Sequence, residues 1–142
     1  MRPLLVGEDN PHSDNPRAAL FPRPRGAAGH RLAEILGMSG AEYLRAFART
    51  NLCDGPWVRA AADLRAEQIQ FVWPGPIVLL GAKVARAFGV PYAPFSTRRS
   101  ADGSTRVLVL PHPSGRCRVW NDPAARTRAR RAVRRLLRLS AD

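Results

Sequence analysis

The sequence predicts an α/β fold in which helices cover both faces of a parallel sheet. Short apolar segments that favour strands alternate with longer amphipathic segments that favour helices, and this unit occurs four times along the chain. Parallel sheets of this kind are buried on both faces. Right-handed crossovers place the carboxyl ends of the strands on one edge of the sheet, where ligands bind in open α/β folds.

Four strands are expected where β-prone apolar residues stop at proline, glycine or polar residues. They are residues 3–6, 50–53, 76–80 and 107–110. The last strand has to end at residue 110, because Pro111 cannot donate to a ladder and because Pro113 and Gly115 prevent a regular restart.

Helices are expected over residues 26–37, 40–47, 57–70, 82–88 and 122–139. The third should face inward with Val58, Ala61, Ala62 and Leu64. The last starts with Asp122 as its cap and Pro123 in its first turn. Its buried stripe is predicted to be Ala125, Ala129, Ala132, Val133, Leu136 and Leu137. Residues 13–25 should form a long loop and residues 89–106 an irregular segment, in which Asp102-Gly103 can turn a hairpin.

The composition fits one domain spanning residues 1–142, with 45% apolar residues. No apolar run approaches the ~20 residues of a membrane span, and no signal-peptide pattern opens the chain. Cys53 and Cys117 are too few for a disulfide framework or a four-cysteine metal site. We therefore expect a cytoplasmic monomer with no membrane partner, no cofactor and no metal.

A polyanion is the partner that the charge favours. The formal net charge is +12, and Lys83 is the only lysine among 23 basic residues. Codon bias can explain a preference for arginine over lysine, but it does not explain the shortage of acidic residues. Nucleic acid, and DNA first, is the expected partner. The outermost of the seven arginines between Arg126 and Arg138 are expected to form a solvated face.

Polar side chains follow several of the expected strands. Glu8, Asp9 and Asn10 come directly after the first strand, Asn51 lies in the second, and His112 follows the fourth. Lys83 lies near the amino end of a helix, where it meets a phosphate or is simply solvated. Two plainer interpretations stay open at this point. The first site can be a solvated loop with a cap, and the second a proline-rich turn that happens to hold a histidine.

The expected crevice combines a carboxylate, an amide and a histidine and is surrounded by arginines. This combination suits the hydrolysis of a bond in a polyanion. Ser114 lies two residues from His112 with no orienting acid, which argues against a Ser-His-Asp arrangement. The three histidines lack a recognised zinc spacing. Cleavage of an N-glycosidic bond fits better, because it needs a carboxylate beside a developing oxocarbenium sugar and a donor for the departing base.

The order of several motifs carries a resemblance to a known family. The motifs are Gly7-Glu8-Asp9-Asn10-Pro11, the segment from Phe21 to Gly29 with Arg31-Leu32, Thr50-Asn51, Leu80-Gly81 with Val84-Ala85, and His112-Pro113-Ser114. From about Leu4 to Asn121 the chain resembles the uracil-DNA glycosylase superfamily, whose first motif is written GQDPY in one branch and GEAPG in another. The resemblance implies a three-layer α/β/α sandwich with a four-stranded parallel sheet.

The resemblance also implies roles for single residues. Asp9 would position water as in the GQDPY branch, or Glu8 as in the GEAPG branch, and His112 would stabilise charge on the leaving base. Phe21 would stack on a flipped base and Asn51 would hydrogen-bond to it. The expected DNA contacts are Ser114, Gly115 and Arg116, with Lys83, Arg23, Arg25 and Arg126 on the surrounding surface.

The chain departs from both branches. Two cysteines cannot hold the iron–sulfur cluster of the GEAPG branch, and Asn10 separates the acid from Pro11. The tyrosine that rejects C5-substituted bases in the GQDPY branch has no counterpart. Asn10, Pro11 and His12 stand there instead, and Asn10 and His12 are the expected contacts to the base at this position.

The expected function is that of a monofunctional DNA glycosylase for uracil or a related modified pyrimidine. The alternatives are a glycosylase for a C5-modified base such as 5-hydroxymethyluracil or 5-hydroxymethylcytosine, a non-catalytic nucleic-acid-binding relative, and an enzyme for free nucleosides or nucleotides.

Overall fold

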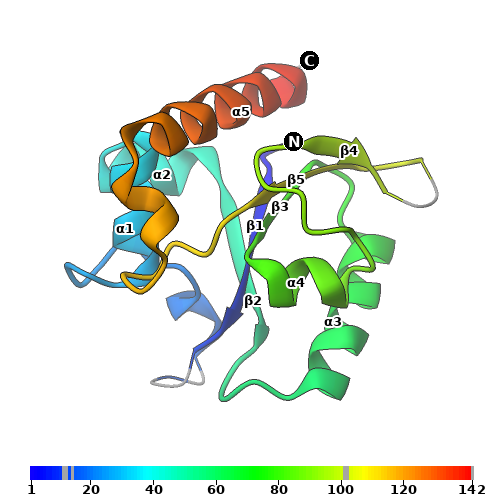
Figure 1. Cartoon of the computed structure of the whole chain (residues 1–142). Coiled ribbons are helices and arrows are strands. Elements are labelled where there is room, and N and C mark those ends of the chain that lie inside the picture. The colour runs from blue at the N-terminus through cyan, green and yellow to red at the C-terminus, as the bar shows by residue number, and fades with distance from the viewer. Residues whose placement is uncertain (11–12, 14, 101–102, 142) are drawn as a thin grey trace.

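The computed structural model describes residues 1–10, 13, 15–100 and 103–141, with side chains as far as residue 139. Its elements alternate between strands and helices along the chain (Figure 1). The strands are β1 Leu4–Asp9, β2 Ala48–Cys53, β3 Ile77–Leu80, β4 Thr97–Arg99 and β5 Arg106–Leu110. The helices are α1 Ala28–Leu36, α2 Gly40–Ala46, α3 Arg59–Val72, α4 Ala82–Ala87 and α5 Pro123–Ala141, with short 3₁₀ turns η1 Pro16–Ala18 and η2 Arg118–Asn121.

The sheet has five strands in the order β2-β1-β3-β5-β4 and is mixed. Neighbours among β2, β1, β3 and β5 pair in parallel, whereas β4 pairs antiparallel with β5. The expectation of an α/β fold is therefore confirmed, but the expectation of a four-stranded, all-parallel sheet is wrong. The extra strand consists of three exposed residues, Thr97 to Arg99, which show no alternation of apolar and polar residues from which a strand could be predicted. It forms because the chain turns back on β5 and pairs Arg99 with Arg106.

Helices cover both faces of the sheet, as Figure 1 shows. Side chains at odd and even positions of a strand point to opposite faces of the sheet, so they belong to two separate hydrophobic cores. Leu5, Leu80 and Leu110 pack with α1, α2 and α5, while Val6, Leu79 and Val109 pack with α3 and α4. The inner strands β3 and β5 are buried along almost their whole length and β1 is buried over Leu4 to Gly7, which explains why these stretches lack a polar alternation. The edge strand β2 is only half-buried over its first three residues, and it is correspondingly more polar.

The first strand is longer than predicted. Hydrophobicity ends at Val6, but the pairing with β2 continues through Gly7 and Asn51 to Asp9 and Cys53. Backbone pairing thus extends β1 over two acidic residues. Glu8 and Asp9 are consequently held by a strand rather than by a loop, which fixes the direction of both side chains.

The helices begin and end close to the predicted residues, with one error of orientation. The Asp122 carboxylate accepts a hydrogen bond from the Ala124 N–H at 2.9 Å, which confirms it as the cap of α5. In α3, however, Val58, Ala61 and Leu64 are exposed, and the buried face is Ala62, Ala66 and Ile69. The prediction failed because alanine occurs on both sides of this helix, so its apolar stripe is poorly defined.

The strand order reverses between β1 and β3. The chain runs from β1 outward to β2 and then returns to the other side of β1 to form β3. At such a point the connections leave in opposite directions, so a crevice opens beyond the carboxyl ends of the two strands. Among the described residues, no helix combines the length and the apolar character needed to cross a membrane.

Candidate active site

A cleft of about 1100 Å³ opens at the carboxyl edge of the sheet, where the strand order reverses. Its walls come from the end of β1, the loop before α1, β2 and the loop after β5. The lining residues are Glu8, Asp9, Asn10, Ala18, Leu20, Phe21, Arg23, Pro24, Ala27, Ala28, Gly29, Asn51, His112, Ser114, Arg116 and Cys117. The cleft therefore combines two carboxylates, two amides, an imidazole, an aromatic ring and two arginines.

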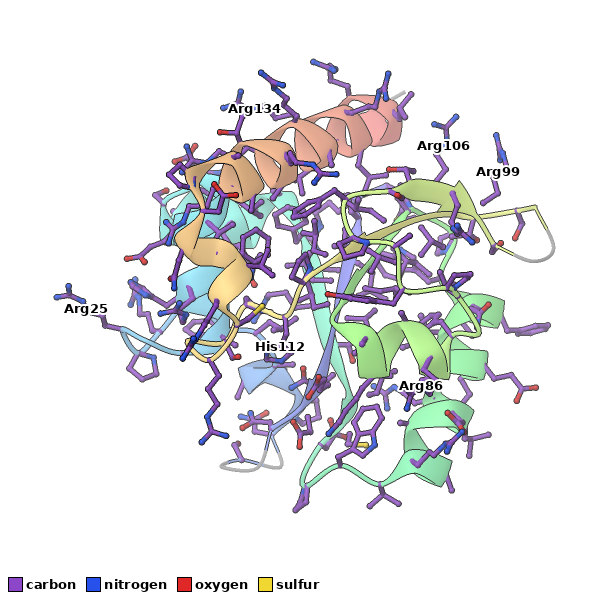
Figure 2. All side chains as sticks on the ribbon, viewed as in Figure 1. Arg25, Arg86, Arg99, Arg106, His112 and Arg134 are labelled. Carbon is purple, nitrogen blue, oxygen red and sulfur yellow. The ribbon has the colours of Figure 1, made fainter. Side chains whose placement is uncertain are left out.

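The hydrogen bonds of His112 define how its ring can act. Its Nδ1 accepts a hydrogen bond from the backbone N–H of Ser114 at 3.1 Å. In a neutral imidazole one nitrogen accepts and the other carries the proton, so the proton is on Nε2. Trp120 donates from Nε1 to the carbonyl oxygen of His112 at 2.9 Å, which holds the backbone of His112 in place. His112 is thus oriented as a donor through Nε2, in the middle of the molecule in Figure 2.

Glu8 lies beside the donor nitrogen of His112. Its Oε2 is 4.0 Å from Nε2, a distance at which charges interact but which is too long for a hydrogen bond. Gly81 separates β3 from α4 with φ of +102°, a conformation that glycine adopts readily. A Cβ at Gly81 would lie 3.3 Å from the Cβ of His112 and 3.4 Å from Oε1 of Glu8. The glycine therefore leaves the space in which the carboxylate and the imidazole meet.

Asp9 belongs to the other face of β1. Alternation along the strand places it on the same face as Gly7, which is paired with Asn51. Asn51 is only 4% exposed. Within the described part of the chain, no fully buried side-chain nitrogen or oxygen lacks a hydrogen-bond partner. The two neighbouring acids are therefore divided, with Glu8 next to His112 and Asp9 on the side of Asn51.

Gly7 makes room for the amide of Asn51. A Cβ at this position would collide with Oδ1 of Asn51 and come within 3.1 Å of Leu20. We expect Gly7→Ala to displace the amide and to lower the single-turnover rate of the reaction proposed below by roughly 10–100-fold, the scale of one misplaced positioning group. Gly55→Ala is the matched control, because no atom lies within 4 Å of a Cβ there. Equal rates for the two variants would show that the position of Asn51 does not matter.

The loop that carries Phe21 is held by several independent contacts. Leu20 has φ of 52°, in the left-handed region that is unfavourable for leucine. The buried Tyr43 hydroxyl donates to the Leu20 carbonyl at 2.8 Å, and burial raises the pKa of this hydroxyl. Arg49 donates to the Ala19 carbonyl at 2.9 Å, and its guanidinium lies 5.3 Å from the centre of the Phe21 ring. These contacts keep the ring at the cleft despite the length of the loop.

Helix α1 packs directly on the backbone of this loop. A Cβ at Gly29 would collide with the carbonyl groups of Leu20 and Phe21. Because only a hydrogen fits there, the amino end of α1 reaches the loop and closes one wall of the cleft. The aromatic ring therefore has a fixed place relative to the sheet.

The loop after β5 is fixed in a similar way. Arg31 donates from Nε to the Pro113 carbonyl at 3.0 Å, across 82 positions of sequence. Its guanidinium also lies 3.5 Å from the place that a Cβ at Gly115 would take. Arg31 on α1 and Trp120 in η2 thus hold the Pro-His-Pro-Ser turn from two sides.

The structure brings most of the predicted site residues together and leaves some outside. Those that line the cleft are Glu8, Asp9, Asn10, Phe21, Arg23, Asn51, His112, Ser114 and Arg116. Gly115 is exposed next to this group, against Arg31. His12, predicted to contact the base, lies outside the described residues together with Pro11.

Besides Gly115, three predicted DNA contacts do not line the cleft. The Lys83 amine lies 5.5 Å from the centre of the Trp57 ring, on the other side of the sheet. Arg126 is partly buried and donates from Nε to the Trp120 carbonyl at 2.9 Å. Arg25 points outward from its loop, as Figure 2 shows. Any contact that these three side chains make with DNA is outside the cleft.

The positioning roles of Gly7, Arg31, Arg49 and Trp120 were not predicted, although Gly7 and Arg31 stand in the motifs that carry the family resemblance. Each acts through a backbone group or a steric contact far away in sequence, and single residues of these types carry no local signal. Nothing in the spacing of the chain links Arg31 to Pro113. The glycine at position 7 could have been suspected, since glycine weakens a strand and often marks a close approach.

The described residues contain no group of three or more His, Cys, Asp or Glu side chains that could hold a metal ion. The polar groups of the cleft have chemistry of their own. They offer a donor on His112, carboxylates on two sides and a buried amide.

Fold and cleft define an α/β protein with a polar, partly cationic site at the strand-order reversal of its sheet. A comparison with known families matches residues 3–137 to the Uracil DNA glycosylase superfamily. The chain belongs to this superfamily, which confirms the resemblance seen in its motifs. Among curated proteins, no match was found.

Proposed function

We propose that this protein is a monofunctional DNA glycosylase that hydrolyses the N-glycosidic bond of uracil or a related modified pyrimidine after base flipping. Membership of the superfamily supports a glycosylase that acts on DNA. The observation that carries the proposal is the cleft itself, in which Asp9, Asn51, Phe21 and His112 face one space.

Phe21 and Asn51 would bind the extruded base. Enzymes that act on a base in DNA take it out of the stack and hold it by stacking and by hydrogen bonds to its Watson–Crick edge. Phe21 supplies an anchored ring, and the Asn51 amide supplies one donor and one acceptor. Because Asn51 is buried and Gly7 leaves room for its amide, the amide can select a base by its hydrogen-bonding pattern.

His112 and the carboxylates would act on the bond. As the C1′–N bond breaks, the electron pair moves onto the base, and the Nε2–H of His112 can donate a hydrogen bond to the carbonyl oxygen where this charge collects. The sugar becomes oxocarbenium-like and is stabilised by a nearby carboxylate. Asp9 would position the water that adds to C1′. The proton released from this water finally balances the charge on the base.

The rim of the cleft would hold the strand. Ser114 and Arg116 line the cleft beside His112, and Arg23 lies opposite on the Phe21 loop. Cations on both sides of a base pocket suit phosphates on both sides of a flipped nucleotide. Arg116 is exposed, so it can enter the gap that the base leaves.

A panel of end-labelled oligonucleotides tests the proposal. Each carries one modified base, in single or double strands, and alkali converts every abasic site into a break. We expect breaks with uracil or a related pyrimidine and none with unmodified DNA. DNA binding without any break across the panel would instead support a non-catalytic relative, and release of base from free nucleosides alone would support a nucleoside hydrolase.

A C5-modified base is a second candidate substrate. Asn10 lines the cleft next to the catalytic acids, where the GQDPY branch carries a tyrosine that this chain lacks. A C5 substituent that can hydrogen-bond with a side chain of the cleft gains preference over plain uracil, because a site that hydrogen-bonds a substrate group rejects the analogue that lacks it. The panel therefore includes 5-hydroxymethyluracil and 5-hydroxymethylcytosine. A clear preference for uracil in both strand states would exclude the enlarged pocket.

The enzyme should not cut the abasic strand on its own. A lyase step needs an amine for a Schiff base, and the one lysine, Lys83, lies against Trp57 outside the cleft. We expect intact abasic strands on denaturing gels unless alkali is added, for the wild type and for Lys83→Ala alike. Incision that persists in Lys83→Ala with a blocked amino terminus would contradict this prediction.

A further inference from the structure

A second hollow, away from the cleft, is lined mainly by arginine. We call it the arginine groove; it lies between α5 and β4 and has a volume of about 620 Å³. Its lining consists of Phe95, Thr97, Arg128, Arg131, Ala132, Arg134, Arg135 and Arg138. None of these residues belongs to the cleft proposed as the active site.

The arginines of α5 divide into two sets. Arg126 and Arg130 donate from Nε to the carbonyl oxygens of Trp120 and Ile35 at 2.9 and 2.8 Å, so they fasten the helix to the domain. The other five are exposed and line the arginine groove. One of them, Arg128, has its guanidinium 4.5 Å from the centre of the Phe95 ring, which fixes it on the floor of the groove.

The positive charge of the groove is not balanced within the described structure. No acidic side chain lines it. The ion pair Arg59–Asp63 and the approach of Glu8 to His112 lie elsewhere among the described residues. β4 adds Arg98 and Arg99 close by, both exposed. Like charges held together repel one another, so a bound polyanion would lower the free energy of this surface.

Nucleic acid is the polyanion that fits best. Arginines recur at positions 128, 131, 135 and 138 along one face of α5, a row of about 15 Å at 1.5 Å per residue. A DNA strand carries a phosphate about every 3.4 Å of helix axis, so the row can meet several in succession. A membrane surface fits poorly. The apolar residues of α5, among them Ala129, Val133 and Leu136, are buried against the domain, so the helix has no apolar face to insert into a lipid layer.

The groove and the cleft lie at different ends of the sheet. α5 starts beside the His112 turn and runs back towards the amino ends of the parallel strands, near the N-terminus in Figure 1. Arg99 pairs with Arg106 at the start of β5, whereas the cleft lies beyond its end. Figure 2 shows Arg99, Arg106 and Arg134 on one side of the molecule and His112 below them.

We propose that the arginine groove is a second nucleic-acid-binding surface, which holds the phosphate backbone of a DNA segment other than the one whose base enters the cleft. Binding there depends on charge and not on sequence or base modification. It needs no catalysis, so it stands or falls separately from the glycosylase activity. A protein with both surfaces can hold one segment while it samples another.

The first test measures the salt dependence of binding to unmodified duplex DNA. The groove variant is Arg131→Ala/Arg134→Ala/Arg138→Ala, and its charge-matched control is Arg45→Ala/Arg59→Ala/Arg86→Ala, three exposed arginines outside the groove. The slope of log K against log salt changes by about 0.9 per phosphate contact. We expect the groove variant to lose roughly 2–3 from the slope and the control less than 1. A groove variant with all three replaced by lysine should keep the slope, and Arg134→Ala alone should lose about 1 if the triple variant does not fold.

The second test asks whether two segments are held at once. An immobilised duplex is loaded with protein, washed, and offered a second, fluorescent duplex. The wild type and the charge-matched control should capture it, and the groove variant should not. The rate on a short single-stranded substrate should be the same for all three proteins, because the cleft is unchanged. Equal slopes for groove variant and control, no capture by the wild type, or displacement of DNA by polyglutamate at equal charge concentration would each overturn the proposal.

Discussion

Replacing His112 by alanine should slow base release by roughly 10²–10³-fold and leave the affinity for substrate DNA nearly unchanged. The expected size is that of one lost donor to a developing negative charge. The effect falls on the chemical step, because Nε2–H meets little charge on the base until the bond breaks. Single-turnover rates at saturating enzyme give the chemical step, and fluorescence anisotropy with the same oligonucleotide gives the affinity.

His30→Ala is the control for this experiment. His30 lies on α1 outside the cleft and accepts a hydrogen bond from the backbone of Gly26. We expect its substitution to change neither quantity by more than a few-fold. If His112→Ala lost binding and turnover to the same extent, the residue would serve to hold the Pro-His-Pro-Ser turn, and the donor role would be wrong.

The second large effect is expected at Asp9. Asp9→Asn should lower the single-turnover rate by about 10²–10⁴-fold, the range for a group that positions or activates water. Glu8→Gln should cost about tenfold, since Glu8 lies 4.0 Å from Nε2 of His112 and acts on that ring. The two substitutions keep the shape of each side chain and remove its charge, so a difference between them reports the separate roles.

Asp54→Asn provides the matched control for both acids. Asp54 directly follows β2, just as Glu8 and Asp9 stand at the end of β1. Unlike them, it is exposed and lies outside the cleft. Its substitution should leave the rate unchanged. The assignment of the site to this edge of the sheet would be refuted if Asp9→Asn and Glu8→Gln also kept full activity on a confirmed substrate.

Sequence patterns predicted most of the fold because the inner parallel strands β1, β3 and β5 are buried on both faces over their apolar residues. Such strands have to be apolar throughout, and the residues that end them have to be polar or helix-starting, so both ends of each unit leave a local signal. Asp122 shows this well, since its carboxylate caps α5 as predicted. The strand Thr97–Arg99 has no apolar pattern of its own, because it forms an exposed edge and is specified by its pairing with β5. The one signal near it was the predicted Asp102-Gly103 hairpin turn, of which Asp102 lies outside the described residues.

The cleft could be predicted in its main groups but not in its arrangement. That His112 and Asn51 meet the acids of β1 follows from the parallel order of the strands, because all of these side chains lie near their carboxyl ends. The separation of Glu8 from Asp9 could not be predicted, since it depends on β1 continuing past its apolar residues through pairing with β2. Nor could the tautomer of His112, which is set by the Ser114 N–H.

For the arginines of α5, composition predicts a polyanion partner but not the contacts of each side chain. Net charge indicated a polyanion partner for the whole chain, and the outermost arginines were expected to be merely solvated. In the folded protein the arginines of α5 make different contacts. Arg126 and Arg130 bind backbone carbonyls of the domain, while Arg128 and its neighbours line a hollow without a carboxylate.

The central claim, hydrolysis of a glycosidic bond in DNA, is tested most directly by following the oxygen atom of water. A single turnover on the preferred oligonucleotide in H₂¹⁸O should release the intact free base without ¹⁸O and leave one ¹⁸O at C1′ of the abasic sugar, as read by mass spectrometry under conditions that limit later exchange. Asp9→Asn should release far less base in the same time. An enzyme that binds the oligonucleotide but releases no base, or that puts ¹⁸O into the base instead of the sugar, would contradict the claim.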